Sequence, residues 1–213
     1  MTSCQCQGIE SLFNEKEARK KLKEYRKNGP QKITKILLEA IKQNNTTNKT
    51  LLDIGGGIGG MQYDLLKSGV SEVTSVDASI AYHNVAEKET EYQGFSNSIK
   101  RYHGDFVELS SEIPHHDIVT MDKVICCYDD IQGLIDHSSK KCNETYGVIY
   151  PIDSVIAKWL QNVVNVFFKV FQNGFQVFIH SRSDIENILS SNGFKLTLRK
   201  THWVWQICVY TKI

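Results

Sequence analysis

The chain has 213 residues, enough for one compact domain with a sizeable core but cramped for two. Hydrophobic residues make up 41% and charged residues 23%, which is ordinary for a globular protein. The formal net charge of +1 excludes a global electrostatic attraction to nucleic acid or to acidic membranes, so no nucleic-acid partner is expected. No apolar N-terminal run precedes a cleavage site, so no signal peptide is predicted.

The N-terminal part, residues 1–48, is expected to form a frayed tail followed by two cap helices. Residues 14–27 are rich in Lys, Arg and Glu with apolar residues at helical spacing, which predicts an exposed helix. Asn28-Gly29-Pro30 ends it, and a second amphipathic helix is expected over residues 33–41.

From residue 49 to residue 213 we expect one domain in which strands alternate with helices. The predicted strands are 51–54, 72–77, 99–102, 117–121 and 146–150, and the predicted helices are 61–67, 80–92 and 131–140. Short β-rich runs joined by helices indicate a doubly wound α/β fold with helices on both faces of a mostly parallel sheet.

Two segments depart from this alternation. Residues 154–171 form a long apolar helix-like stretch inside an insertion at about 152–178, and it is too polar for a transmembrane span. It is compatible with a pocket-lining helix, a core helix, or a membrane-surface or dimer contact. Residues 196–203 and 204–210 predict an antiparallel hairpin at one edge, which completes a seven-stranded sheet.

The six cysteines favour free thiols in a reducing compartment, and hence a cytoplasmic location. Cys4-Gln5-Cys6 is too closely spaced for a usual zinc knuckle, and His115-His116 has no partners at metal-ligand spacing, so no metal is predicted. Cys126 and Cys127 are expected to be buried in an apolar strand.

A glycine-rich turn follows the first predicted strand and leads into a helix. Only glycine lets the backbone turn sharply and lie against a ligand, so this loop predicts a nucleotide-like cofactor. Gly55-x-Gly57-x-x-Gly60 satisfies the dinucleotide fingerprint. Asp53-x-Gly55-x-Gly57-x-Gly59 equally resembles the motif of class I S-adenosylmethionine-dependent methyltransferases.

The methyltransferase resemblance implies a Rossmann-like fold, S-adenosylmethionine as cofactor and S-adenosylhomocysteine as product. It implies that Asp53 helps to hold the amino-acid end and that Asp77 accepts the ribose hydroxyls, a role that a dinucleotide-binding protein would share. It also implies that Asp105 meets the adenine amino group, although a turn or helix-capping role remains an alternative. The remaining cofactor-binding candidates are Tyr25, Gly55, Gly57, Gly59, Ala78, Phe106 and Met121.

Several segments resemble the magnesium protoporphyrin IX O-methyltransferases and their relatives. They are Met121–Asp130 after the fourth strand, Phe178–Ser181 followed by Asp184–Glu186, and Phe13-Asn14 with Tyr25-Arg26 near the N-terminus. The N-terminus departs from that family in being basic and polar, and no residue identifies a tetrapyrrole. The resemblance therefore implies fold and cofactor, with a carboxylate or another apolar acceptor as an option.

Catalytic candidates are few. Tyr25 is placed to close over the methionine carboxylate, or else simply packs between helices. Tyr128 and His180 are candidates to face the acceptor, with ordinary surface or core roles as the alternative, and Asp122 is compatible with a turn cap. A carboxylate acceptor is already ionised and needs no base, whereas a phenol or an amine needs one.

The predicted function is methyl transfer from S-adenosylmethionine to a small, apolar or carboxylate-bearing molecule. A non-catalytic cofactor- or partner-binding module on the same fold is the alternative. An NAD(P)-dependent oxidoreductase rests only on the ambiguity of the glycine loop. The sequence leaves the oligomeric state open.

Overall fold

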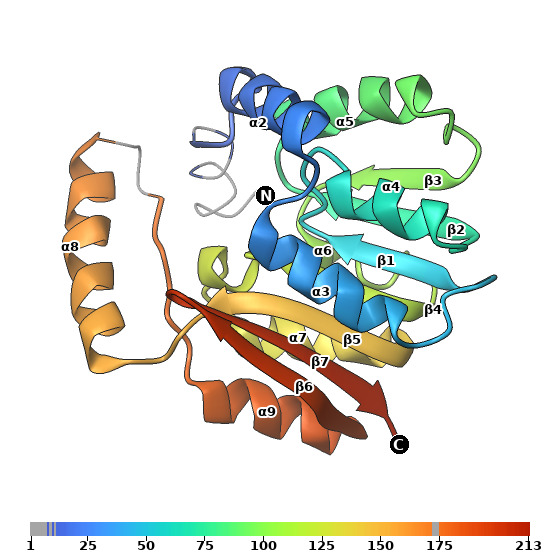
Figure 1. The fold of residues 1–213 in the computed structure, drawn as a ribbon. Coiled ribbons are helices and arrows are strands. Elements are labelled where there is room, and N and C mark those ends of the chain that lie inside the picture. Colours follow the sequence, from blue (N-terminus) through green and yellow to red (C-terminus); the bar gives the residue numbers. More distant parts are fainter. Residues whose placement is uncertain (1–7, 9, 11, 172–174) are drawn as a thin grey trace.

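A seven-stranded sheet forms the centre of the molecule, a computed structural model that describes residues 8, 10, 12–171 and 175–213 (Figure 1). The helices are α2 Glu15–Asn28, α3 Lys32–Lys42, α4 Gly60–Lys67, α5 Ile80–Tyr92, α6 Phe106–Leu109, the 3-10 helix η1 Ile125–Cys127, α7 Ile131–Lys140, α8 Val155–Phe171 and α9 Arg182–Ser191. The strands are β1 Thr50–Ile54, β2 Glu72–Asp77, β3 Ile99–His103, β4 His116–Asp122, β5 Cys142–Pro151, β6 Phe194–His202 and β7 Trp205–Lys212.

The strand order is β3-β2-β1-β4-β5-β7-β6, with β1 to β5 parallel and both β7 pairings antiparallel. The predicted doubly wound, mostly parallel seven-stranded sheet with a C-terminal hairpin is therefore confirmed. Because the chain runs outward from β1 to β3 and then returns to β4 beside β1, a crevice opens where the order reverses.

The sheet buries one apolar layer on each face. One layer, under α3 and α4, contains Leu37, Ile41 and Leu51. The opposite layer, under α6, α7 and α9, contains Val119, Leu134 and Leu189 (Figure 1). Every parallel strand alternates between these layers, so a shift of one residue in register would move the side chains fitted to one layer into the other.

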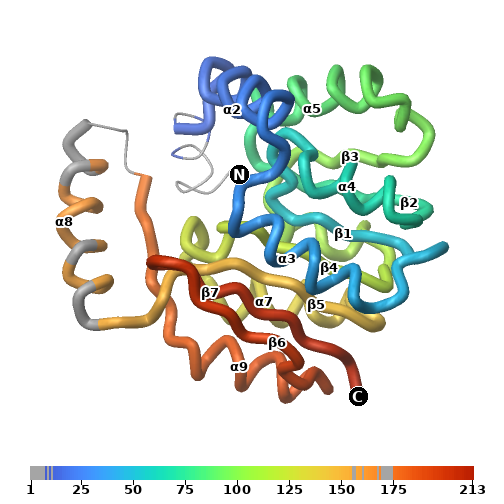
Figure 2. The backbone as a smooth tube through the Cα atoms, viewed as in Figure 1, coloured from blue at the N-terminus to red at the C-terminus, as the bar shows by residue number. Residues whose placement is uncertain are grey.

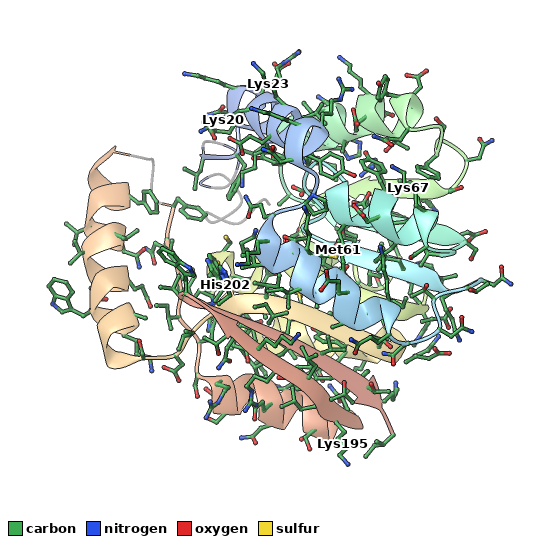
Figure 3. The ribbon with its side chains drawn as sticks, in the orientation of Figure 1. Lys20, Lys23, Met61, Lys67, Lys195 and His202 are labelled. Carbon is green, nitrogen blue, oxygen red and sulfur yellow. The ribbon has the colours of Figure 1, made fainter. Side chains whose placement is uncertain are left out.

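The two N-terminal helices take different positions: α3 packs on one face of the sheet, α2 packs on α5, and both contribute residues to the end at which the parallel strands finish. The Asn14 side chain caps α2 by accepting from the Glu17 backbone N–H at 3.2 Å. Gly29, with φ 71°, ends the same helix. Figure 3 shows Lys20 and Lys23 of α2 pointing away from the body, as the charge pattern predicts. The predicted tail at residues 1–9 falls almost wholly outside the described residues.

Helix α8 stands apart from the sheet and is attached to the chain that follows it through two polar side chains. Its Asn165 side chain donates to the Val177 carbonyl at 2.9 Å and accepts from the Val177 N–H at 2.8 Å, and Gln161 accepts from the Ile179 N–H. Figure 2 shows the chain after α8 running beside it towards α9. On the opposite side of the helix Trp159 is 64% exposed and Val166 65%. The side of α8 that carries Gln161 and Asn165 therefore faces the protein, together with Phe168, whose ring lies 5.4 Å from that of Phe175.

Two local predictions were wrong. Cys126 and Cys127 lie in the 3-10 helix η1 after β4, not in a strand, because Lys123 with φ 64° turns the chain as β4 ends. Strand β5 begins at Cys142, four residues before the predicted start, where His116 of β4 is its partner. Among the described residues, no helix is both long and apolar enough to cross a bilayer.

Candidate active site

A cavity of about 1270 Å³ lies at the carboxyl ends of β1, β2 and β4, beneath α2 and α3. Its volume exceeds the range of about 300–1,000 Å³ that is usual for a pocket holding one small ligand. Nine of the predicted site residues line it. They are Tyr25, Asp53, Gly55, Gly57, Asp77, Ala78, Asp105, Phe106 and Tyr128.

Neighbouring side chains lie so close to the backbone of the glycine loop that positions such as Gly55 and Gly59 have no room for a Cβ atom. At Gly55 (φ 66°) an added Cβ would lie 2.3 Å from Val124 Cγ2. At Gly57 (φ 56°) an added Cβ would be in ordinary van der Waals contact, 3.7 Å from the Tyr82 ring, so the need for glycine here comes from the positive φ. Gly59 does not line the cavity; there a Cβ would collide with the Tyr63 hydroxyl.

Asp53 is a buried carboxylate at the end of β1, and it is 3% exposed. Gln62 Nε2 donates to its Oδ2 at 2.9 Å and Thr120 Oγ1 donates to its Oδ1 at 2.7 Å. Both donors are neutral, and burial raises the pKa of Asp53 to about 6. A bound cation beside this carboxylate would favour its ionised form.

Asp77 ends β2 and supports the glycine loop directly. Its Oδ2 accepts from the Gly57 backbone N–H at 2.8 Å, and its Oδ1 accepts from the Ser79 N–H at 2.8 Å. Burial raises the pKa of Asp77, and these two donors oppose the rise. Each carboxylate oxygen has lone pairs beyond those used here, so the group can accept further hydrogen bonds. Ala78 follows it on the cavity wall.

Asp105, on the cavity wall, has two roles: it caps the short helix α6 and it binds the Tyr128 hydroxyl. Its Oδ1 accepts from the Val107 N–H at 2.8 Å, which caps the short helix α6. The Tyr128 hydroxyl lies 2.7 and 2.8 Å from its two oxygens. Phe106, 4% exposed, follows as an apolar neighbour. Tyr128 is therefore directed at Asp105.

Two other predicted site residues lie away from the cavity. Met121 is fully buried in the sheet and does not line the wall. His180 also does not line it; its Nε2 donates to the Tyr128 carbonyl at 2.7 Å. Burial lowers the pKa of His180, which favours the neutral ring. This ring positions the loop that carries Tyr128.

Tyr25 projects from α2 over the first turn of α4. An added Cβ on Gly60 would lie 3.1 Å from its ring, so the glycine run also makes room for this tyrosine. Burial raises the pKa of Tyr25, so its hydroxyl stays protonated at neutral pH. α2 thereby covers the loop that joins β1 to α4.

Sequence reasoning missed several wall residues. Tyr82, on α5, has a buried hydroxyl without a hydrogen-bond partner among the described residues, and it lies beside Gly57. Val124 packs on Gly55, and Lys123 and Asp122 line the side under α3. Their place in the chain could have indicated Asp122, Lys123 and Val124, because they end or follow β4, next to the crevice.

The described residues fit S-adenosylmethionine. Asp53 provides a buried carboxylate whose hydrogen-bond donors are neutral, and Gly57, Asp77 and Tyr82 line the same cavity, where the buried Tyr82 hydroxyl has no partner among the described residues. The sheet order, the acid-plus-glycine loop and the cavity together define a Rossmann-like methyltransferase fold.

The chain belongs to the methyltransferase domain family, because the model of that domain matches residues 24–198. It is a methyltransferase that depends on S-adenosylmethionine, as the sequence predicted. No curated protein matches the chain.

Solved structures share the fold. Magnesium protoporphyrin IX methyltransferase from Synechocystis PCC 6803 with bound S-adenosylhomocysteine superposes with a TM-score of 0.67 at 17% identity, covering 85% of this chain and 81% of that one. The same enzyme with bound S-adenosylmethionine gives 0.65 at 16%, covering 85% and 78%. An O-methyltransferase family protein from Burkholderia thailandensis gives 0.66 at 12%, covering 84% and 56%. These similarities concern the fold.

Proposed function

We propose that this chain transfers a methyl group from S-adenosylmethionine to a small molecule that is apolar or bears a carboxylate. One observation carries the proposal: Asp53, Asp77 and Asp105, from three separate strand ends, line one cavity with the glycine loop. In this proposal Asp53 faces the ammonium group, Asp77 accepts the ribose hydroxyls and Asp105 meets the adenine amino group. Tyr25 closes over the methionine carboxylate.

The bound cofactor would supply a methyl group on a sulfonium: the acceptor would bond to the methyl carbon in line with the C–S bond, which breaks, and S-adenosylhomocysteine would leave with the electron pair. The protein's part is to orient the acceptor and exclude water. The wall beyond the glycine loop is suited to this, because Phe168, Phe175 and Val177 form an apolar side. Lys21 lies on the α2 side of the same cavity and can attract an anionic acceptor, whereas Lys123, on the β4 side, is paired with Asp122 at 3.3 Å.

A carboxylate acceptor agrees best with the side chains present. Tyr128 is hydrogen-bonded to Asp105 and His180 to the Tyr128 carbonyl, so neither of the two predicted catalytic candidates is directed at the acceptor side. A carboxylate needs no base, because it is ionised at neutral pH.

The proposed division of the chain follows the site. Residues 1–48 supply the cap helices, residues 49–213 the cofactor-binding domain, and the insertion at about 152–178 the acceptor-side cover. Phe168 of α8 lines the cavity and its ring lies 5.4 Å from that of Phe175. The outward face of α8, with Trp159 and Val163 exposed, is where we place the proposed membrane-surface contact.

Isothermal titration with S-adenosylmethionine, S-adenosylhomocysteine and NAD tests the cofactor assignment. We expect binding of the first two and none of NAD. Binding of NAD without S-adenosylmethionine would refute it. Transfer of a labelled methyl group to carboxylate-bearing extract fractions tests the reaction. Cofactor binding without any labelled product, together with constant co-purification of one partner, would favour the non-catalytic alternative.

A further inference from the structure

The two adjacent cysteines of η1 line the cavity beside the cofactor region. Cys126 is buried and Cys127 half-buried, and their Sγ atoms are 4.0 Å apart. Both thiols face the Lys123 carbonyl, at 3.4 and 3.8 Å. They therefore form a close dithiol on the wall of an open cavity.

The 3-10 turn creates this pair. In a strand, successive side chains point to opposite faces, so two adjacent thiols would diverge. Here the Cys127 N–H donates to the Val124 carbonyl at 2.8 Å, which closes the turn and brings both thiols to the Lys123 carbonyl. The Phe178 N–H donates to the Cys126 carbonyl at 2.8 Å and fixes the turn against the chain after α8.

The sulfur separation suits a shared thiophilic centre. Bonds of about 2.3 Å to a pyramidal trivalent centre, at an angle of about 100°, place two sulfurs roughly 3.5 Å apart, so the pair needs to close by only about 0.5 Å. A disulfide needs about 2.05 Å and therefore a much larger movement. Within residues 8, 10, 12–171 and 175–213, no three His, Cys, Asp or Glu side chains are grouped to hold a metal ion. A structural zinc site is therefore disfavoured, and a ligand satisfied by two thiols is favoured.

We propose that Cys126 and Cys127 form a two-thiolate binding site for trivalent organoarsenicals, and that its occupancy excludes the cofactor. An arsenical oxide, R–As=O, condenses with both thiols to give R–As(S-Cys)₂ and one water. Two As–S bonds replace the As=O bond, both thiol protons go to the departing oxygen, and arsenic stays trivalent.

The exclusion of the cofactor follows from the neighbours of the dithiol, and this part rests on the proposed function. Val124, one turn earlier, packs on Gly55 of the glycine loop. Cys127 lines the same cavity as Asp77, the proposed ribose acceptor. A group attached to both sulfurs occupies space on the same wall.

The test uses the full chain with Cys4 and Cys6 replaced by serine, so that the N-terminal thiols do not react. Phenylarsine oxide is added, and intact-mass spectrometry under native conditions counts bound phenylarsenic groups. We expect one group per chain, lost in Cys126→Ser and in Cys127→Ser and retained in the matched controls Cys142→Ser and Cys208→Ser, which alter buried thiols off the cavity wall. Retention in both η1 variants would overturn the site.

Saturating S-adenosylhomocysteine should slow the reaction of phenylarsine oxide with the protein at least tenfold. This measurement uses the protein with both η1 cysteines and needs no η1 variant. Circular dichroism checks that the serine variants are folded. Arsenical binding with unchanged affinity for S-adenosylhomocysteine would overturn the exclusion while leaving the site. Arsenical binding in a protein that binds no S-adenosylhomocysteine would leave the site and refute the proposed function instead.

Discussion

Replacing Asp53 by asparagine is expected to stabilise the ligand-free protein at neutral pH. The pKa of Asp53 is raised from 3.8 to about 6 in the folded state because the carboxylate is buried. The folded state therefore binds more protons than the unfolded state between about pH 4 and pH 6. Stability contributed by this group falls as the pH rises through that window and stays low above it.

The magnitude follows from the two pKa values. A change from 3.8 to about 6 corresponds to about 3 kcal/mol, which is an upper limit for the cost of keeping the carboxylate ionised at pH 7. An asparagine at this position needs an acceptor for its amide, and Gln62 Oε1, which has no partner among the described residues, can provide it if the glutamine amide rotates. That rotation leaves Gln62 Nε2 less well paired, at a cost of about 1 kcal/mol. We expect a net gain of about 2 kcal/mol at pH 7.

Urea unfolding followed by circular dichroism at pH 4, 5, 6, 7 and 8 measures this. With the cost of about 1 kcal/mol included, the wild type should be more stable than Asp53→Asn by about 0.5 kcal/mol at pH 4, and the variant should gain its full advantage of about 2 kcal/mol by pH 7. Asp117→Asn is a matched control. Asp117 lies near the start of β4, away from the cavity, and its carboxylate accepts a hydrogen bond from the Thr50 backbone N–H. A pH-independent difference, or a destabilised Asp53→Asn protein at pH 7, would refute the reasoning. The same variant should bind S-adenosylmethionine at least tenfold more weakly.

Three further outcomes are expected. Asp77→Ala should weaken binding of S-adenosylhomocysteine by about 1–3 kcal/mol in calorimetry; unchanged affinity would remove it from the ribose site. Tyr128→Phe should weaken cofactor binding by about 1 kcal/mol and leave kcat nearly unchanged; a loss of kcat at constant affinity would make the tyrosine catalytic. Trp159→Ser with Val163→Ser should reduce co-sedimentation with phosphatidylglycerol vesicles, whereas Asn162→Ser should not; equal sedimentation of both would exclude contact through α8.

Much of the fold could be predicted from local patterns. The apolar runs, the break at Gly29 and the hairpin around Trp203 each depend on a few adjacent residues, and the structure has the corresponding elements in the predicted order. The side of α8 that faces the protein could not be predicted. An apolar stripe normally faces inward, but here Gln161 and Asn165 face inward beside Phe168, because their side-chain amides are hydrogen-bonded to an extended backbone segment.

The site residues could be predicted where an acid or a glycine lies at the end of, or in the turn directly after, a strand that the sequence pattern predicts. Asp53, Asp77, Gly55 and Gly57 are of this kind, and each lines the cavity, whereas Gly59 does not. The contact of Tyr128 with Asp105 joins residues 23 positions apart and depends on η1, which no propensity signalled. Met121 shows the converse limit, because its strand face, set by register with Val148, points it into the core.

The attachment of α8 has a consequence for how this protein can diversify. The segment leaves the sheet at Ile152, whose N–H donates to the Val204 carbonyl at 2.8 Å, and it rejoins the main body near Phe178. Between these points the Gln161 and Asn165 amides bind backbone, so their contacts do not depend on neighbouring side-chain identity. We expect such a cover to be exchangeable as a cassette, so that acceptor preference can change while the cofactor-binding half keeps its sequence.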